Sequence, residues 1–440
     1  MTDLLDAVLR RVTPERLRAA AVRVTSIPSP TGREGPLAAW LAEELRASGI
    51  DGRVQSIDAE QANAVGRVRG ARTGPDLMLY APIDTLTTGD PAEDVPWIGP
   101  RLRPDMLPDG QADGDLVRGL GAGNPKGHAA CVLVTGQAYA EAVAELGIAP
   151  AGDLVLAFGA GGMPTNAIGA GRANTGHGVG ASFLLERGWY TDHAIIAKPG
   201  DFVAHDEVGL CWFEIVVHGV HTYAGSRHRL PYSNPIVSAA EVAVRLERWL
   251  AGFPARHRTA TAAPQGVIGA VAGGWERMPA VTPAACRLRL DVRLAPGQRP
   301  LDVRRELSAF LDDVAAATGA DLDCELVAHI PGSTTDPGSW VIRETVRAWE
   351  AASGRPHRPI PDNSGATDAN ILRGRGVPTA RVGMPKVVPA DGTADFAQGM
   401  NTVSVTAMRR LCEVLARVAV ANALGARRTH GPGPEEGEER

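Results

Sequence analysis

Three apolar runs with the composition of buried strands are each followed by residues that could form part of a ligand-binding or catalytic site. Asp84 follows the run LMLYAP, a glycine pair follows DLVLAFGA, and Lys198 ends HAIIAK. Open α/β sheets bind ligands at the carboxyl ends of their strands, so these residues are candidates for one site. A carboxylate there can act as a base or cap the turn TLTTGD that follows it. An ammonium can polarise a carbonyl, bind a carboxylate, or pair with Asp84 as a structural salt bridge.

Length and composition limit the classes of protein to consider. The 440 residues are too many for one small core and favour two domains. The net charge of −5 and the lack of a dense basic stripe argue against a nucleic-acid partner. No run of roughly 18 apolar residues predicts a membrane span. The five scattered cysteines are typical of reduced core thiols, and the N-terminus has no signal-peptide core, so we expect a cytoplasmic protein without membrane partners.

The first half of the chain alternates strands and helices. Thr13-Pro14 predicts a helix start, and Thr31 to Glu34 has the spacing of a capping box before the helix LAAWLAEELRASG. The segment KGHAACVLVTGQAYAEAVAEL, between two of the strand-like runs, has the period of a long helix. This alternation predicts an α/β fold, a mostly parallel sheet with helices on both faces.

The pattern changes near Val208. CWFEIVVHGVH, VIGAVAGG and CRLRLDVRL are strand-like, and two amphipathic helices lie among them, which is typical of a small α+β domain. We therefore expect a large α/β domain over 1–206 and 321–425 with a smaller domain, 207–320, inserted in it. The Gly-, Pro- and charge-rich segment 426–440 is expected to be a disordered tail.

Nine short fragments, in this order along the chain, carry a family resemblance: YAPIDT, GLGAGNPKG, LAFGAGGM, AIIAKPG, GVHTYAG, SNPI, DVRLAPG, SGATDAN and QGMNT. Together they resemble the M20 family of dinuclear-zinc peptidases and amidohydrolases over roughly residues 15 to 425. The resemblance implies the two-domain fold described above, with the smaller domain pairing two chains into a homodimer.

The same resemblance implies that the metal ligands have been replaced. Such a site holds two zinc ions about 3.5–4 Å apart with His and carboxylate ligands and a glutamate base. The matching positions in this sequence are occupied by Pro82, Asn124, Gly162, Met163, Lys198 and Gln398. We therefore predict no metal and no other cofactor. The alternative is a conventional metal-dependent amidohydrolase whose ligands lie at nearby residues such as His128, His193, His205, His218 or Asp395.

Site residues follow from the same matched positions. Asp84, Lys198 and His221 are the catalytic candidates, since His221 matches a family histidine that reaches across the dimer to an oxyanion. Asp368 is expected to brace its loop. The predicted substrate-binding residues are Asn124, Lys126, Asn234, Arg293, Gly365, Thr367 and Gln398.

Two functions remain open on these grounds. The first is a metal-independent enzyme acting on a small carboxylate- or amide-bearing molecule, by C–N bond cleavage, ring opening or closure, or related proton-transfer chemistry. The second is a non-catalytic pseudoenzyme that serves as a binding or scaffold protein. The complete loss of metal ligands beside retained substrate-side residues favours the first.

Overall fold

The computed structural model describes residues 2–166, 172, 176–388 and 395–425. The chain divides into two compact units. The first unit comprises Met1–His205, Thr335–Arg358 and Arg375–Arg440, and the second comprises Asp206–Thr334 and Pro359–Gly374. The predicted tail 426–440 lies outside the described residues.

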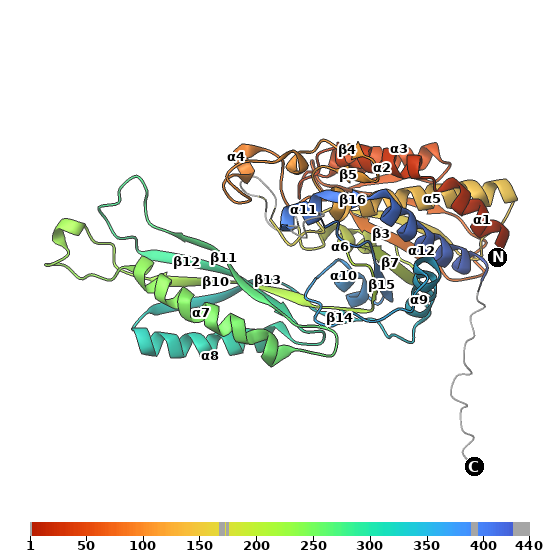
Figure 1. Ribbon diagram of the computed structural model, residues 1–440. Helices are drawn as coiled ribbons and strands as arrows, with labels where there is room; N and C mark the ends of the chain where they lie inside the picture. Colours follow the sequence, from red (N-terminus) through yellow and green to blue (C-terminus); the bar gives the residue numbers. More distant parts are fainter. Residues whose placement is uncertain (1, 167–171, 173–175, 389–394, 426–440) are drawn as a thin grey trace, which may run out of the picture. The chain divides into compact units, whose positions relative to one another are not determined.

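A seven-stranded sheet forms the centre of the first unit (Figure 1). Its strand order is β1-β2-β6-β3-β7-β15-β8, and the neighbours β6, β3, β7 and β15 run parallel. The strands are Arg53–Ser56 (β1), Ala62–Val68 (β2), Leu77–Pro82 (β3), Leu154–Gly159 (β6), His193–Ala197 (β7), Val203–Ala204 (β8) and Thr379–Val382 (β15). Every residue of β3 and β6 is buried, which is why these strands are continuously apolar. The predicted α/β class and parallel core are confirmed.

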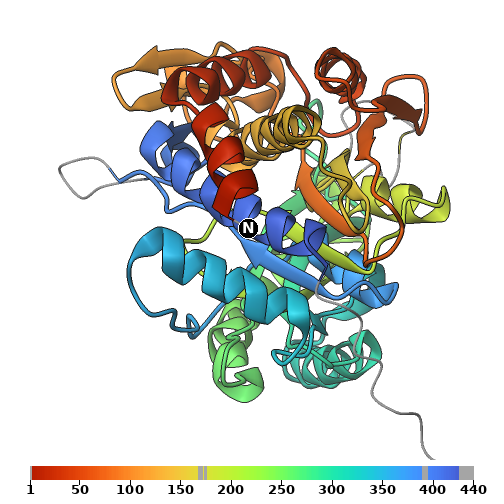
Figure 2. The same cartoon turned by 90° about the vertical axis from the view of Figure 1, so that its right-hand side faces the viewer.

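Helices pack against this sheet. Among them α1, α5 and α12 lie beside one another, and α5 and α12 also contact β3 (Figure 2). The α-helices of the first unit are Thr2–Arg11 (α1), Pro14–Thr25 (α2), Gly35–Ala47 (α3), Pro91–Asp94 (α4), Gly127–Leu146 (α5), Val179–Glu186 (α6), Trp340–Ser353 (α9), Phe396–Asn401 (α11) and Val405–Ala423 (α12). A single turn, Ala122–Lys126 (η2), precedes α5, and a 3-10 turn, Pro104–Met106 (η1), lies in the loop after α4. A small antiparallel sheet joins Gln111–Asp113 (β4), Leu116–Arg118 (β5) and Thr402–Ser404 (β16).

The second unit has its own sheet and core. Its four antiparallel strands, in the order β11-β12-β10-β13, are Gly266–Gly273 (β11), Ala285–Leu294 (β12), Gly209–His218 (β10) and Asp321–Ile330 (β13). Helices Pro235–His257 (α7) and Pro300–Thr318 (α8) pack side by side against this sheet (Figure 1) and form the hydrophobic core with it. The remaining elements are Asp206–Glu207 (β9), Ala224–Ser226 (η3), Ser333–Thr334 (β14) and Ala369–Gly374 (α10).

The second unit is larger than the sequence predicts. The expected boundary at residue 320 separates β13 from its unit, yet β13 pairs with β10 from Leu210↔Ile330 to His218↔Asp321. Residues 359–374 also belong to the second unit, because Asn363 pairs with Ala262 and the amide of Asn370 donates to the Val208 carbonyl at 2.8 Å. The SGATDAN segment is therefore part of the second unit.

One predicted helix start differs in its chemistry. Helix α2 begins as expected, with the Thr13 hydroxyl accepting from the Arg16 amide at 3.2 Å. Helix α3 has Glu34 at its N-cap position, and no side chain caps it. The predicted capping box of Thr31 and Glu34 is wrong because both side chains turn to the ends of the central strands. No helix of the described residues is long and apolar enough to cross a membrane.

Candidate functional site

Asp84 lies two residues beyond β3 and is completely buried. Its Oδ2 accepts hydrogen bonds from the Thr31 hydroxyl at 2.7 Å and the Met163 amide at 2.9 Å. Its Oδ1 accepts from the Gly162 amide at 2.8 Å. The segment after β6 therefore presents backbone N–H groups to the carboxylate of Asp84. A fully buried carboxylate cannot contact a substrate, so this placement argues against Asp84 itself carrying a proton to or from one.

Glu34 is a second buried carboxyl at the same strand ends, and the sequence analysis did not select it. Its Oε1 accepts from the amides of Gly161 at 2.8 Å and Gly32 at 3.0 Å, and from the Gln61 side chain at 3.3 Å. Its Oε2 has no hydrogen-bond partner among the described residues. Burial, followed by the charge of Asp84, raises the pKa of Glu34 to about 8.

The two carboxyl groups differ in the groups that surround them. Burial raises the pKa of Asp84 as well, while the Thr31 hydroxyl, the charge of Lys198 and two backbone amides act in the opposite direction. Asp84 therefore has a hydroxyl donor and a nearby cation that favour its ionised form, and neither is among the groups that lower the pKa of Glu34. Consecutive amides of Gly161, Gly162 and Met163 bind both groups, which ties the pair to one short segment.

Lys198 follows β7 and is 5% exposed. Its Nζ donates to the Asn124 Oδ1 at 3.3 Å, and its charge lowers the pKa of Asp84. The ammonium predicted to stand near Asp84 therefore lies within electrostatic reach of it. Asn124 is half-buried in η2, and its Nδ2 donates to the Met400 sulfur at 3.3 Å.

The positions that the M20 resemblance assigns to metal ligands and the glutamate base do not fit a dinuclear metal centre. Zinc takes thiolate, imidazole or carboxylate ligands, and the six matching positions offer proline, glycine, methionine, lysine and two amides. Among the described residues no group of three or more His, Cys, Asp and Glu side chains is placed to hold a metal ion. His128 is buried beside Lys198, and its Nε2 accepts from the Met384 amide at 3.4 Å. Burial, then the charges of Lys198 and Arg381, lowers the pKa of His128 to about 3.

Two other predicted binding residues of the first unit make internal bonds. The fully buried Lys126 donates through Nζ to the carbonyls of Ile27 at 2.6 Å and Thr25 at 3.4 Å, and burial lowers its pKa to about 7. Gln398 closes a capping box at the start of α11: its backbone N–H donates to the Asp395 Oδ1 at 2.7 Å, and its Oε1 accepts from the Asp395 backbone N–H at 3.2 Å. Lys126 therefore ties the end of α2 to η2, and Gln398 stabilises a short helix.

The predicted residues His221, Asn234 and Arg293 belong to the second unit. His221 is exposed, and its Nδ1 lies 2.7 Å from the Thr282 carbonyl. Because a carbonyl only accepts, Nδ1 carries the proton, and in the neutral ring Nε2 is an acceptor. In the neutral ring, Nε2 of His221 can accept a proton as a base, but it cannot donate to an oxyanion as the sequence predicts. Asn234 caps α7 through its Oδ1, and Arg293 pairs with Asp291 at 2.7 Å.

The loop with the predicted residues Gly365 and Thr367 is held from within the second unit. The Gly365 amide donates to the Asn363 Oδ1 at 3.1 Å, and the Thr367 hydroxyl donates to the Glu207 Oε2 at 2.5 Å. Glu207 is completely buried, and Asp368 is 3% exposed. These bonds fix the loop conformation before α10.

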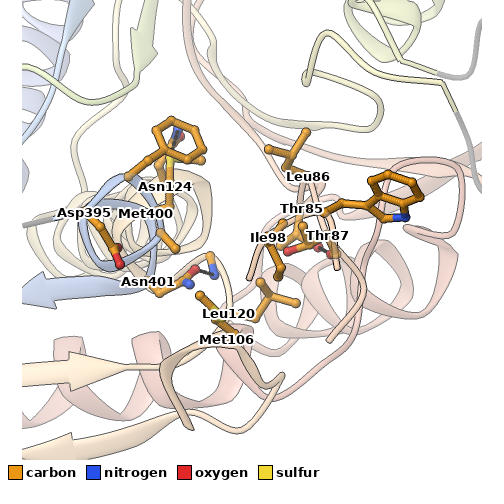
Figure 3. Close-up of a pocket in the computed structure, with 14 residues that line it drawn as sticks. Thr85, Leu86, Thr87, Ile98, Met106, Leu120, Asn124, Asp395, Met400 and Asn401 are labelled. Carbon is orange, nitrogen blue, oxygen red and sulfur yellow. Dashed lines mark hydrogen bonds between the residues drawn. The ribbon is translucent and has the colours of Figure 1, made fainter. Parts of the chain in front are cut away.

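A pocket of about 440 Å³ opens in the first unit beside Asn124. Figure 3 shows Asn124, Met400 and Asp395 on one side of it, Leu86 and Ile98 on the other, and Met106 with Leu120 at its base. Trp97 and Phe396 also line it. The walls of this pocket come from segments about 300 residues apart, so no local spacing in the sequence predicts it.

Solved structures of other proteins share the fold of this chain. No model of a known protein family matches the sequence. Human carnosine dipeptidase 1 superposes with a TM-score of 0.70 at 13% identity, over 96% of this chain and 99% of that one. A tripeptidase from Staphylococcus aureus gives 0.67 at 16% identity, over 94% and 99%. A dinuclear metal-binding M20 peptidase from Bacillus subtilis gives 0.61 at 15% identity, over 93% and 98%. The structural neighbours of this chain are M20 family peptidases and amidohydrolases, and the chain has their fold with its smaller second unit.

Proposed function

We propose that the strand-end edge of the first unit is a metal-independent site for a small carboxylate- or amide-bearing molecule. The observation that carries the proposal is the position of Lys198, whose ammonium donates to the Asn124 Oδ1 at 3.3 Å, since Asn124 lines a pocket of about 440 Å³. Lys198 supplies the positive charge, and the buried carboxyl of Asp84 compensates that charge.

The chemistry we propose needs a polarised carbonyl and a proton transfer, as in cleavage of an activated C–N bond or opening or closure of a ring. An ammonium and an amide N–H can both donate to a carbonyl or carboxylate oxygen. Asp84 then acts as a positioning residue for Lys198, since its carboxylate is not exposed. His221 belongs to the second unit, and its Nε2 can accept a proton when the ring is neutral; that it acts as a base is a separate proposal, which His221→Asn tests.

A second function has its own support in the burial of the site. Lys198 is only 5% exposed and Asp84 is not exposed, which is also expected for a salt bridge that stabilises a non-catalytic scaffold. The two functions differ in what the removal of the ammonium changes.

Lys198→Met distinguishes them, with Lys386→Met as a matched control. The sequence has only three lysines, and Lys386 is the exposed one. N-acyl, carbamoyl and cyclic amide derivatives of small carboxylic acids are tested for binding by calorimetry and for turnover by mass spectrometry, with and without a chelator. Loss of a charge-assisted hydrogen bond costs about 1.5–3 kcal/mol, so Lys198→Met should weaken binding roughly 10- to 100-fold while Lys386→Met does not.

The scaffold function predicts a different outcome. No compound would bind the unaltered protein, and Lys198→Met would lower its thermal stability by leaving the buried charge of Asp84 without its cation. Turnover that a chelator abolishes would contradict both functions.

A further inference from the structure

Two loops extend from the same end of the second unit's sheet (Figure 1). The first, 219–233, follows β10, and the second, 274–284, joins β11 to β12. The Thr282 amide donates to the Thr222 carbonyl at 2.9 Å, and the Thr222 amide donates to the Thr282 hydroxyl at 2.9 Å. These bonds hold the two loops against each other, so their side chains form one surface, which we call the loop face.

The loop face is rich in exposed aromatic and apolar side chains. Five of them are between 38% and 54% exposed: Tyr223, Leu230, Tyr232, Trp275 and Met278. Exposed apolar clusters of this kind mark interaction surfaces, and Tyr, Trp, Met and Arg are the residue types enriched at protein–protein interfaces. Because these side chains are distributed along two loops, they suit an extended segment that contacts several of them at once.

Three exposed guanidinium groups lie among these rings. Arg227 lies over the Tyr232 ring, with its Cζ 4.2 Å from the ring centroid, and Arg277 lies over the Trp275 ring at 4.7 Å. Arg229 donates through Nε to the neighbouring histidine ring at 2.8 Å. Within the described residues no carboxylate pairs with any of these three arginines. Contact with a ring leaves guanidinium N–H groups available to donate to an anion.

Other arginines of the second unit have carboxylate partners. Arg256 pairs with Glu306 at 2.9 Å, and Arg289 pairs with Glu214 at 2.6 Å. The two loops contain a single acidic residue, Glu276, against three arginines. The loop face is therefore locally positive on a chain whose net charge is −5, and its charge is complementary to that of an acidic partner.

We propose that the loop face binds an acidic, extended peptide segment of a partner protein. Carboxylates of the segment bind Arg227, Arg229 and Arg277, since a guanidinium presents paired N–H donors to a carboxylate. Apolar side chains of the segment pack on the exposed rings. The loop face belongs to the second unit, and the proposal goes beyond the function proposed for Lys198 and does not depend on it.

Fluorescence anisotropy with a defined probe tests the proposal on the full chain. The probe is the peptide Glu-Leu-Glu-Phe-Glu-Leu-Glu-amide, labelled at its amino end with a neutral fluorophore. We expect saturable binding that weakens several-fold as the salt concentration rises from about 50 mM to about 500 mM, because exposed ion pairs are screened. The same peptide with glutamine in place of glutamate should bind about tenfold more weakly. Equal binding of the two peptides would overturn the proposal.

Paired substitutions locate the ionic contact. Arg227→Ser combined with Arg229→Ser should weaken binding of the probe roughly 3- to 30-fold, the range expected for two exposed ion pairs. Arg304→Ser combined with Arg305→Ser is the matched control, because it removes the same charge from two exposed arginines of α8 in the same unit. The control should retain binding. Equal losses in the two double variants would indicate nonspecific attraction and would contradict the proposal.

An aromatic substitution tests the apolar part of the contact. Trp275→Ala should weaken binding of the probe about tenfold, since tryptophans carry a large share of the binding energy at interfaces. Trp97→Ala replaces an exposed tryptophan of the first unit and should not change binding. The substituted side chains are exposed, so thermal melting should give every variant the melting temperature of the unaltered protein. Undiminished affinity of the folded Trp275→Ala variant would count against the proposed contact.

Other occupants of the loop face give different results. Loss of the proposed dimer in light scattering of the Arg227→Ser, Arg229→Ser variant would assign the face to a second copy of the chain. Tighter binding of a single-stranded oligonucleotide than of the probe would assign it to nucleic acid. Tighter binding of the probe after the glutamates of the chain's own acidic segment, 435–439, are replaced with glutamine would assign it to that segment. Each of these results would overturn the proposal of an acidic peptide partner.

Discussion

Replacing Glu34 with glutamine should remove part of the pH dependence of the free energy of unfolding. Glu34 is fully buried, and the pKa of its carboxyl is raised from 4.5 to about 8, chiefly by burial and then by Asp84. Between pH 4.5 and 8 the unfolded chain loses this proton while the folded protein keeps it. The unfolded state is therefore favoured as the pH rises through this window, and stability falls until the folded carboxyl also ionises near pH 8.

The magnitude follows from the pKa difference. One pKa unit corresponds to about 1.4 kcal/mol, so the loss between pH 5 and pH 9 that Glu34 causes is roughly 4 kcal/mol. Glu34→Gln removes this loss, because glutamine does not ionise and its carbonyl can still accept from the amides of Gly32 and Gly161. Its amide nitrogen replaces the unpartnered Oε2, and burying unpaired donors there costs about 1–3 kcal/mol at every pH.

The variant should thus be less stable than the unaltered protein at pH 5 and more stable at pH 9. Urea unfolding at a series of pH values measures both free energies. Glu43→Gln, on the exposed side of α3, is the matched control and should follow the unaltered protein. Parallel curves for the Glu34→Gln variant and the unaltered protein would refute the protonated, buried state of Glu34.

Three further predictions concern other parts of the fold. Burial lowers the pKa of Lys126 to about 7, so the unaltered protein should gain stability relative to Lys126→Met as the pH rises from about 7 toward 10.5 in urea unfolding; a constant difference would contradict this. Thr31→Val removes a hydroxyl donor to the carboxylate of Asp84 and should cost about 1.5–3 kcal/mol in the same assay, whereas a loss below 0.5 kcal/mol would speak against that bond. We propose that the exposed edge strand β11 pairs two chains, so light scattering should give a dimer mass that Val271→Lys lowers and Val327→Lys, on the opposite edge, does not. A monomer at micromolar concentration would contradict the proposed dimer.

The parts of the fold that could be predicted are those in which local pattern and burial agree. Strands β3, β6 and β7 are continuously apolar because parallel strands are buried on both faces. Strand β13 was missed because its alternating residues, DLDCELVAHI, include none that is fully buried. Its membership of the second unit depends on pairing with β10, more than 100 residues earlier, which no local pattern encodes.

The candidate site was predictable only in part for a similar reason. The positions of Lys198 and Asp84 after their strands follow from the parallel arrangement of those strands. The role of Glu34 could not be predicted, because its spacing from Thr31 is also that of a capping box. Only the tertiary fold turns both side chains toward Asp84. The pocket forms only where α11 lies near the loop after β3, which the sequence does not predict. Trp97, which is exposed there, belongs to no periodic apolar pattern in the sequence.

Metal content tests the central claim most directly. Pro82, Gly162 and Lys198 occupy positions where the M20 resemblance expects metal ligands or a glutamate base, and none supplies the carboxylate or imidazole that zinc requires. The full-length protein is purified without added metal, equilibrated with excess zinc, dialysed, and measured by elemental analysis. We predict far less than one equivalent of zinc, cobalt or manganese per chain, with melting temperature and ligand binding unchanged by a chelator. Two equivalents of bound metal per chain would contradict the claim.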